Sequence, residues 1–248
     1  MKQLKKIYRK DYQGEDVVTD IELKNTQWEI TKEFIPNSVF NNQISNKACV
    51  IGNGISRKEF PIKSVFNQFG GLLAREKLQT YGCNALYREH TPDFLVISGD
   101  DDGIITEVAN SGYCDENVVY ASAPHIQYHP GKFYLIPQDP AWNSGSVATY
   151  LACFDSHTTV YLLGFDGQDT DGCNYNVYAG TPNYQAATNA QADPAFFDIT
   201  MRNVFETYGD VDFVRVMPSK YSSMPEAWKF VTNLRQISFR DFVLESDL

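Results

Sequence analysis

Ala48-Cys49-Val50-Ile51-Gly52-Asn53-Gly54-Ile55-Ser56-Arg57 is the stretch that decides the fold. Its four leading apolar residues predict a buried strand, and the glycines after them predict a tight turn at the carboxyl end of that strand. Glycines at such a turn let backbone amide groups approach an anion, and Asn53, Ser56 and Arg57 add side-chain donors. Because ligands bind at this edge of open α/β sheets, the turn predicts a nucleotide-type phosphate site. A strand-ending turn that holds no ligand would show the same pattern.

The chain after this stretch alternates short apolar runs with helical stretches, which is the pattern of βα units that carry a parallel sheet. We therefore expect an α/β protein with a Rossmann-like, open, mostly parallel sheet flanked by helices. The predicted strands span residues 48–51, 94–98, 118–121, 133–136, 159–163 and 211–216. The predicted helices span residues 66–78, 104–110, 144–154 and 195–208, with a last one near 225–234.

The first 45 residues differ from the rest and predict an N-terminal β-hairpin arm. Residues 17–23 and 28–35 alternate apolar with polar side chains, and Lys24-Asn25-Thr26 between them is typical of a turn. An isolated hairpin is marginal in water, so it must pack on its own domain or on a second copy of the chain. The sequence thus predicts an arm over residues 1–45, a nucleotide-binding domain over 46–248, and surfaces compatible with a homo-oligomer.

Composition and charge narrow the function classes. A chain of 248 residues with 43% hydrophobic content can bury one main core. The formal net charge of -10 disfavours nucleic acid as a partner, and the basic residues near the N-terminus predict only a solvated tail. The chain has no apolar run near the ~20 residues that span a bilayer and no signal-peptide pattern at its start. We expect a cytoplasmic protein with no membrane partner.

Three consecutive carboxylates, Asp100, Asp101 and Asp102, follow the strand predicted at 94–98. Like charges this close need a helix N-terminus, a cation or solvent to stabilise them. Asp102 fits the cap of the following helix. The alternative is that Asp100 and Asp102 hold a magnesium ion that binds a diphosphate.

Two further segments are predicted to reach the same sheet edge as the glycine turn. Ser144, Gly145 and Ser146 open a helix rich in small residues, whose free N–H groups suit a phosphate or carboxylate. Asn143 or Ser144 is its expected cap. Asp166 follows the strand at 159–163 and fits either a ligand contact or a carboxylate that stabilises its own turn.

The order of these motifs resembles that of bacterial sialyltransferases of the Campylobacter type, which are Rossmann-like proteins. The resemblance covers about residues 48–216 and is carried by four motifs: Gly52-Asn53-Gly54-x-Ser56; Asn84 with Pro92-Asp93 and Asp100; Ser144-Gly145; and Leu163-Gly164-Phe165-Asp166. In that family the glycine turn and the asparagines hold the CMP part of CMP-sialic acid. The resemblance implies that Gly52, Asn53, Gly54, Ser56 and Asn84 contact a nucleotide here, with Ser144 and Gly145 near the ribose or base.

The resemblance also implies a glycosyltransferase that uses an activated sugar, with no obligatory cofactor and an unknown acceptor. Tyrosines bond the leaving phosphate in that family, and Tyr175, Tyr178 and Tyr184 are the candidates here. The family's general base is a histidine after the Gly-x-Asp strand, whereas all four histidines of this chain precede Gly164. Asp166, Asp169 or Asp171 is then the candidate base.

Two other functions remain open. The Tyr-Gly-Cys-Asn-Ala-Leu-Tyr-Arg segment at 81–88 and the Tyr-Ala-Gly-Thr-Pro-Asn-Tyr segment at 178–184 resemble proteins of tailed bacteriophages. That likeness allows a non-enzymatic phage binding or assembly protein in a host cytoplasm. The carboxylates at 100–102 allow a magnesium-dependent diphosphate transfer or hydrolysis, similar to pterin pyrophosphokinases.

Overall fold

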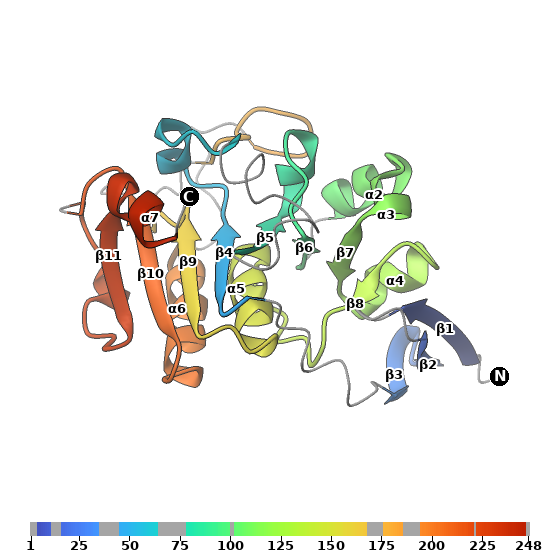
Figure 1. The fold of residues 1–248 in the computed structure, drawn as a ribbon. Coiled ribbons are helices and arrows are strands. Elements are labelled where there is room, and N and C mark those ends of the chain that lie inside the picture. The colour runs from blue at the N-terminus through green and yellow to red at the C-terminus, as the bar shows by residue number, and fades with distance from the viewer. Residues whose placement is uncertain are drawn as a thin grey trace.

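The structure is a computed structural model that describes residues 4–10, 16–34, 45–63, 78–99, 102–167, 176–185, 194–220 and 222–246. Within these ranges the chain forms an eight-stranded sheet in the order β11-β10-β9-β4-β5-β6-β7-β8, and a separate three-stranded sheet in the order β1-β2-β3. Every neighbouring pair in the larger sheet is parallel. The expected open parallel α/β fold is confirmed (Figure 1).

The strands of the larger sheet are β4 (Lys47–Ile51), β5 (Gln79–Cys83), β6 (Phe94–Ile97), β7 (Val118–Ala121), β8 (Tyr134–Leu135), β9 (Thr159–Leu163), β10 (Asp212–Met217) and β11 (Leu234–Ser238). The α-helices described are α2 (Asp102–Asn110), α3 (Tyr113–Glu116), α4 (Ala123–Tyr128), α5 (Ser144–Phe154), α6 (Pro194–Thr207) and α7 (Phe239–Glu245). Short 3-10 helices are η2 (Ile55–Glu59), η4 (Asn84–Arg88) and η5 (Glu226–Trp228).

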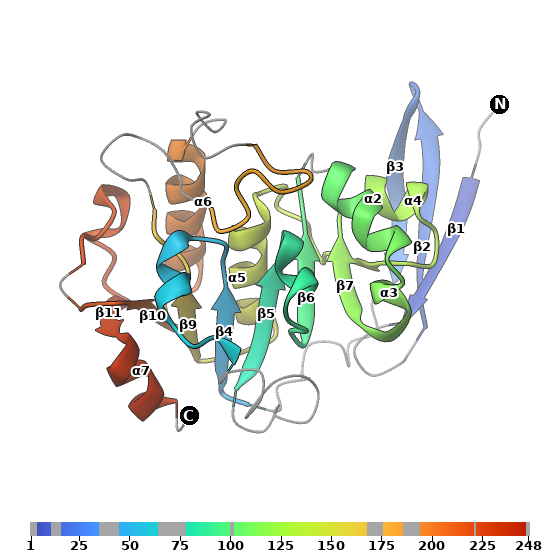
Figure 2. The ribbon, with the colours of Figure 1, turned by 90° about the horizontal axis from the view of Figure 1, so that it is seen from above.

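Two hydrophobic layers hold the helices against the sheet. Alternate residues of each strand face opposite sides, so Ala48 and Val50 of β4 pack with α5 and α6, while Cys49 and Ile51 pack with α2 and α7. All four side chains are fully buried. Seen from above, α5 and α6 lie on one face of the sheet and α7 lies on the other (Figure 2).

The N-terminal arm contains the expected hairpin and one more strand. The strands β2 (Asp16–Lys24) and β3 (Gln27–Phe34) pair antiparallel around the turn at Asn25 and Thr26, which both have positive φ. The extra strand β1 (Leu4–Lys10) pairs antiparallel with β2. This small sheet lies beyond β8, at one end of the larger sheet in both views (Figures 1 and 2).

The expectation for the last part of the chain was wrong. In place of a helix near 225–234 the structure has the single turn η5, the edge strand β11 and then α7. Strand β11 forms because Leu234 to Ser238 extend the sheet beside β10. A capping box then starts α7, in which the Ser238 hydroxyl accepts from the Asp241 backbone N–H and the Asp241 carboxylate accepts from Ser238. The helix predicted at 66–78 falls largely outside the described residues.

No helix in the described ranges is both long enough and apolar enough to cross a bilayer.

A buried polar cluster lies where Tyr81 of β5 meets the segment between α5 and β9. The Tyr81 hydroxyl donates to the Asp155 carboxylate at 2.6 Å, and its oxygen is 3.0 Å from His157 Nε2. His157 is only 1% exposed. Burial disfavours the imidazolium form and lowers the pKa of His157 to about 4.

We expect this histidine to make folding pH-dependent. An unfolded histidine takes up a proton near pH 6.5, but folded His157 resists it down to about pH 4, so the folded state loses stability as the pH falls between these values. The expected loss at pH 5 is about 2 kcal/mol relative to pH 7.5. Urea unfolding of the wild type and of His157→Gln across pH 5–7.5 measures it, because carboxylates common to both proteins cancel in the difference. Parallel pH profiles for the two proteins would contradict the assignment.

Candidate functional site

The candidate site lies where the strand order reverses. From β4 the chain builds β5 to β8 on one side, and it then returns to form β9 to β11 on the other side. Ile51 at the end of β4 pairs with Leu163 at the end of β9, so the turns after both strands lie side by side. The Gly52 N–H donates to the Leu163 carbonyl at 2.8 Å, and the Gly54 N–H donates to the Gly164 carbonyl at 2.9 Å. Such a reversal point is where open α/β sheets bind ligands.

Asp166 joins the two turns. Its carboxylate accepts a bond of 2.9 Å from the Ser56 backbone N–H at one oxygen and a bond from the Ser56 hydroxyl at the other. The expected proximity of Asp166 to the glycine turn is therefore seen. Both carboxylate oxygens of Asp166 are bonded to Ser56, so Asp166 holds the glycine turn in its conformation.

Arg57 brings a positive charge into the same edge. Its side chain is 4% exposed, Nη1 donates to the Gly52 carbonyl at 3.1 Å, and Nη2 donates to the Tyr178 hydroxyl at 2.7 Å. The guanidinium carbon is 5.1 Å from the centroid of the Tyr178 ring. Among the described residues no carboxylate pairs with Arg57, so its charge is not offset by an ion pair there.

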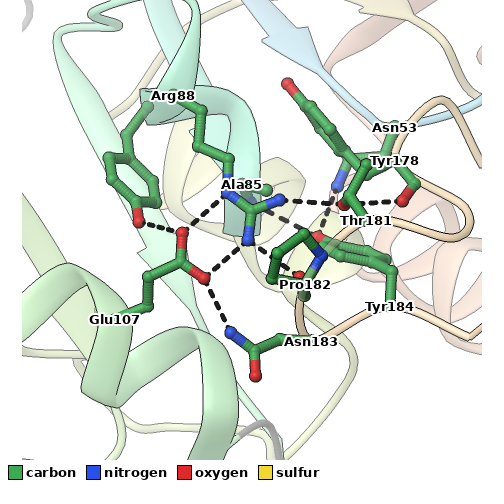
Figure 3. A network of polar contacts seen from close by, with 10 residues as sticks. Asn53, Ala85, Arg88, Glu107, Tyr178, Thr181, Pro182, Asn183 and Tyr184 are labelled. Carbon is green, nitrogen blue, oxygen red and sulfur yellow. Dashed lines mark hydrogen bonds and ion pairs between the residues drawn. The ribbon is translucent and has the colours of Figure 1, made fainter.

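The loop over residues 176–185 packs against the glycine turn. The Val177 N–H donates to the Asn53 carbonyl at 2.8 Å, and Asn176 forms a bridge with Gly54. The Tyr184 hydroxyl accepts from Asn53 Nδ2 at 3.4 Å and from the Ala85 N–H at 3.3 Å. The Tyr184 ring is 5.6 Å from that of Tyr178. The loop thus brings two of the three predicted tyrosines, Tyr178 and Tyr184, to the ends of β4 and β5 (Figure 3).

Asn84 lies at the end of β5, as the first residue of η4. Its φ of +49° is in the left-handed region, which asparagine tolerates better than most residues. The side-chain carbonyl oxygens of Asn84 and Asn53 are both inaccessible to solvent, and neither has a hydrogen-bond partner within the described chain. A buried polar atom without a partner costs about 1–3 kcal/mol. Two such acceptors thus lie at the ends of the neighbouring strands β4 and β5, beside the glycine turn.

Tyr178 is set up as a hydrogen-bond donor. Burial raises the pKa of its hydroxyl, and the Arg57 charge opposes this only in part, so the group stays protonated at neutral pH. The oxygen already accepts from Arg57, and its own hydrogen has no acceptor among the residues described.

The start of α5 is bonded mainly to the protein. Asn143 is its cap and accepts from the Ser146 N–H at 3.0 Å. The Ser144 hydroxyl donates to the Ser98 carbonyl at 3.1 Å, and that of Ser146 lies 2.8 Å from Thr200 Oγ1. The hydroxyl groups of Ser144 and Ser146 thus connect α5 to β6 and α6. Of the three residues predicted to bind a ligand here, Gly145 is the one that has no side chain to bond with.

Most of the acidic segment lies outside the described residues. Asp100 and Asp101 lie outside the described residues, and Asp102 opens α2 with its side chain outside the description. Tyr175, Asp169 and Asp171 also fall outside. Within the described ranges there is no cluster of three or more His, Cys, Asp or Glu side chains that could hold a metal ion.

Sequence patterns missed three residues that shape this edge, namely Arg88, Glu107 and Arg215. Arg215 in β10 is 1% exposed and donates to the carbonyls of Phe165 at 2.8 Å, Asp166 at 2.6 Å and Ser223 at 2.7 Å. Burial lowers its pKa to about 10. The one signal in the sequence is an arginine within the apolar run 213–217. Arg88 and Glu107 form an ion pair beside the loop.

The chain matches no family model and no curated protein. Among solved structures it is similar to a variant of the sialyltransferase CST-II in complex with CMP, with 12% identity, a TM-score of 0.47, and coverage of 69% of this chain and 82% of the other. It is also similar to the sialyltransferase CstII from Campylobacter jejuni in complex with CMP-3FNeuAc, with 14% identity, a TM-score of 0.41, and coverage of 69% and 80%. At these values the likeness decides nothing about function, which rests on the residues of this chain.

The turn geometry predicts a contrast between two glycine substitutions. A Cβ atom on Gly54 would lie 2.5 Å from the Gly164 carbonyl oxygen and 2.6 Å from the Asp166 side chain, so Gly54→Ala must push the two strand ends apart. We expect it to lower the free energy of unfolding by about 1–3 kcal/mol.

The matched control is Gly145→Ala. Its Cβ atom would meet nothing closer than 3.5 Å, and alanine favours a helix, so we expect no loss of stability. Chemical denaturation of both variants measures the contrast. Equal stability of the two variants would show that the approach of β4 and β9 is not tight.

Proposed function

We propose that the protein is a glycosyltransferase-like enzyme that binds a nucleotide-activated sugar, CMP-linked, at this edge and transfers the sugar to an acceptor. The observation that carries the proposal is the pair of buried, unpartnered carbonyl oxygens of Asn53 and Asn84 at neighbouring strand ends. Neutral acceptors of this kind match the hydroxyl and amino groups of a nucleoside. The glycine turn and the resemblance of its motif to that of sialyltransferases support the same class of ligand.

The phosphate part of such a donor fits the groups beside the asparagines. Arg57 supplies a buried positive charge without an ion-pair partner in the described chain, and the Tyr178 hydroxyl has a hydrogen to donate. Charge-assisted and hydroxyl donors of this kind stabilise a departing phosphate oxygen. Tyr184, whose hydroxyl lies between Asn53 and Ala85, is proposed as the second tyrosine that contacts the nucleotide.

The proposed reaction is a displacement at the anomeric carbon. An acceptor hydroxyl oxygen bonds to that carbon, the bond from the carbon to the phosphate oxygen breaks, and the nucleotide leaves as an anion. The acceptor proton passes to a base. Both oxygens of Asp166 are bonded to Ser56, so we assign Asp166 to holding the turn and propose Asp169 or Asp171 as the base.

A nucleotide-binding experiment tests the proposal. We expect CMP to raise the melting temperature more than UMP or GMP does at equal millimolar concentration. Asn53→Ala and Asn84→Gly should each weaken CMP binding about tenfold or more, because each removes a buried ligand acceptor. Glycine is chosen at position 84 because it tolerates the positive φ there. Calorimetric titration gives the affinities, and Arg202→Ala, in an exposed ion pair on α6, is the control.

The outcomes separate the competing functions. If none of the nucleotides shifts the melting temperature, the nucleotide site does not exist. Binding of CMP with no consumption of a CMP-linked sugar would favour the non-enzymatic binding or assembly protein. A diphosphate-processing activity that chelation abolishes would favour the magnesium-dependent alternative with Asp100 and Asp102.

A further inference from the structure

The ion pair between Arg88 and Glu107 connects three parts of the molecule: η4, α2 and the loop at 176–185. Arg88 is the last residue of η4, which Asn84 begins, and Glu107 lies on α2. Arg88 Nε donates to Glu107 Oε1 at 2.7 Å, and Nη2 donates to Oε2 at 2.6 Å. This is the two-pronged geometry of a strong arginine–carboxylate pair. It connects the helix that follows β5 to the helix that follows β6.

The same two side chains also hold the middle of the loop at 176–185. Arg88 Nη1 donates to the Thr181 hydroxyl at 2.9 Å, and Nη2 donates to the Pro182 carbonyl at 2.9 Å. Glu107 accepts from Asn183 Nδ2 at 2.6 Å. The pair therefore bonds three consecutive residues of the loop, as Figure 3 shows.

These three residues lie between the two tyrosines. The Thr181 N–H and hydroxyl donate to the Tyr178 carbonyl at 2.9 and 2.7 Å, and the Tyr184 N–H donates to the Thr181 carbonyl at 3.0 Å. The Arg88 guanidinium carbon is 5.9 Å from the centroid of each tyrosine ring, within cation–π range. Holding Thr181 thus fixes the backbone on which both rings depend.

The pair stays charged over the whole neutral range. The Arg88 guanidinium holds the pKa of Glu107 down to about 2, with burial acting against it and Tyr87 and Asn183 adding donors. The same bond raises the pKa of Arg88. Both side chains remain 20–28% exposed, and partly exposed ion pairs contribute little to global stability. The other residues that this pair bonds to lie mainly in the loop at 176–185, so we expect its main effect there.

We propose that Arg88, together with Glu107, is a positioning residue that orders the loop at 176–185 and so places the Tyr178 and Tyr184 hydroxyls in the nucleotide site. The effect on the ligand rests on the proposed function, whereas the effect on the loop does not. Arg88 is not in bonding contact with the reacting groups in this assignment. It acts through the tyrosines.

Hydrogen exchange tests the ordering of the loop without any ligand. We expect Arg88→Ala to speed amide exchange in peptides covering 176–185 at least tenfold, while β4 and β5 keep wild-type protection. Glu107→Gln keeps one acceptor and should give a smaller increase, and it serves if Arg88→Ala fails to fold. Arg202→Ala removes an exposed ion pair on α6 and is the matched control. Loop exchange equal to that of the control, or equal acceleration in β4 and β5, would overturn the proposal.

A double-mutant cycle with CMP as the probe tests the link to the site. If Arg88 acts through Tyr184, then Tyr184→Phe weakens CMP binding in the wild type but has a clearly smaller effect in the Arg88→Ala background. Full additivity of the two substitutions would contradict a positioning role. Failure of the wild type to bind CMP would remove the proposed function, and the exchange experiment would still decide whether Arg88 and Glu107 order the loop.

Discussion

The ends of β4 and β9 approach each other so closely that only hydrogen atoms fit between Gly54 and the Gly164 carbonyl group. This approach follows from the reversal of strand order, because β9 must lie directly beside the first strand of the sheet. It brings Asp166 within bonding distance of Ser56, and it turns the Asn53 carbonyl toward the loop, where Val177 bonds to it. The glycines therefore matter first for packing, and the shape of the candidate site is a consequence of that packing.

Three arginines at this edge differ in what offsets their charge. Arg215 donates to three backbone carbonyls and to Gln236, and Arg88 is paired with the Glu107 carboxylate. Arg57 is as deeply buried as the first but bonds only one carbonyl and one hydroxyl in the described chain. A guanidinium with few acceptors around it favours a nearby anion. Among the three, Arg57 has the fewest acceptors in the described chain, and the proposed function therefore places the donor phosphate beside it.

The sequence predicted the parts of the fold that depend on apolar periodicity. The strands at 118–121 and 159–163 and the helix at 144–154 match the structure at both ends. Strand β5 was not predicted because its first residues, Gln79 and Thr80, are polar. Both are nevertheless buried, and Thr80 bonds to the carboxylate of Asp93, which directly precedes the neighbouring strand β6. Strand order placed Asp166 at the edge of the glycine turn, whereas Asn84 follows the unpredicted strand β5 and was proposed only through the resemblance. Arg88 and Glu107 were missed because their contacts with the loop at 181–183 span 76 to 94 residues, and hydrophobic periodicity reports only on local structure.

The protonation state of the Tyr178 hydroxyl decides whether it can act as a base or as a hydrogen-bond donor. A tyrosine acts as a general base only when its pKa falls toward neutrality, but burial raises the pKa of Tyr178. Arg57 donates to the hydroxyl oxygen, so the hydroxyl hydrogen stays available to another acceptor. Such a group can donate to an oxygen that gains negative charge, and it cannot remove a proton from an incoming hydroxyl. Under the proposed function, Tyr178 is therefore suited to the leaving group and not to the base.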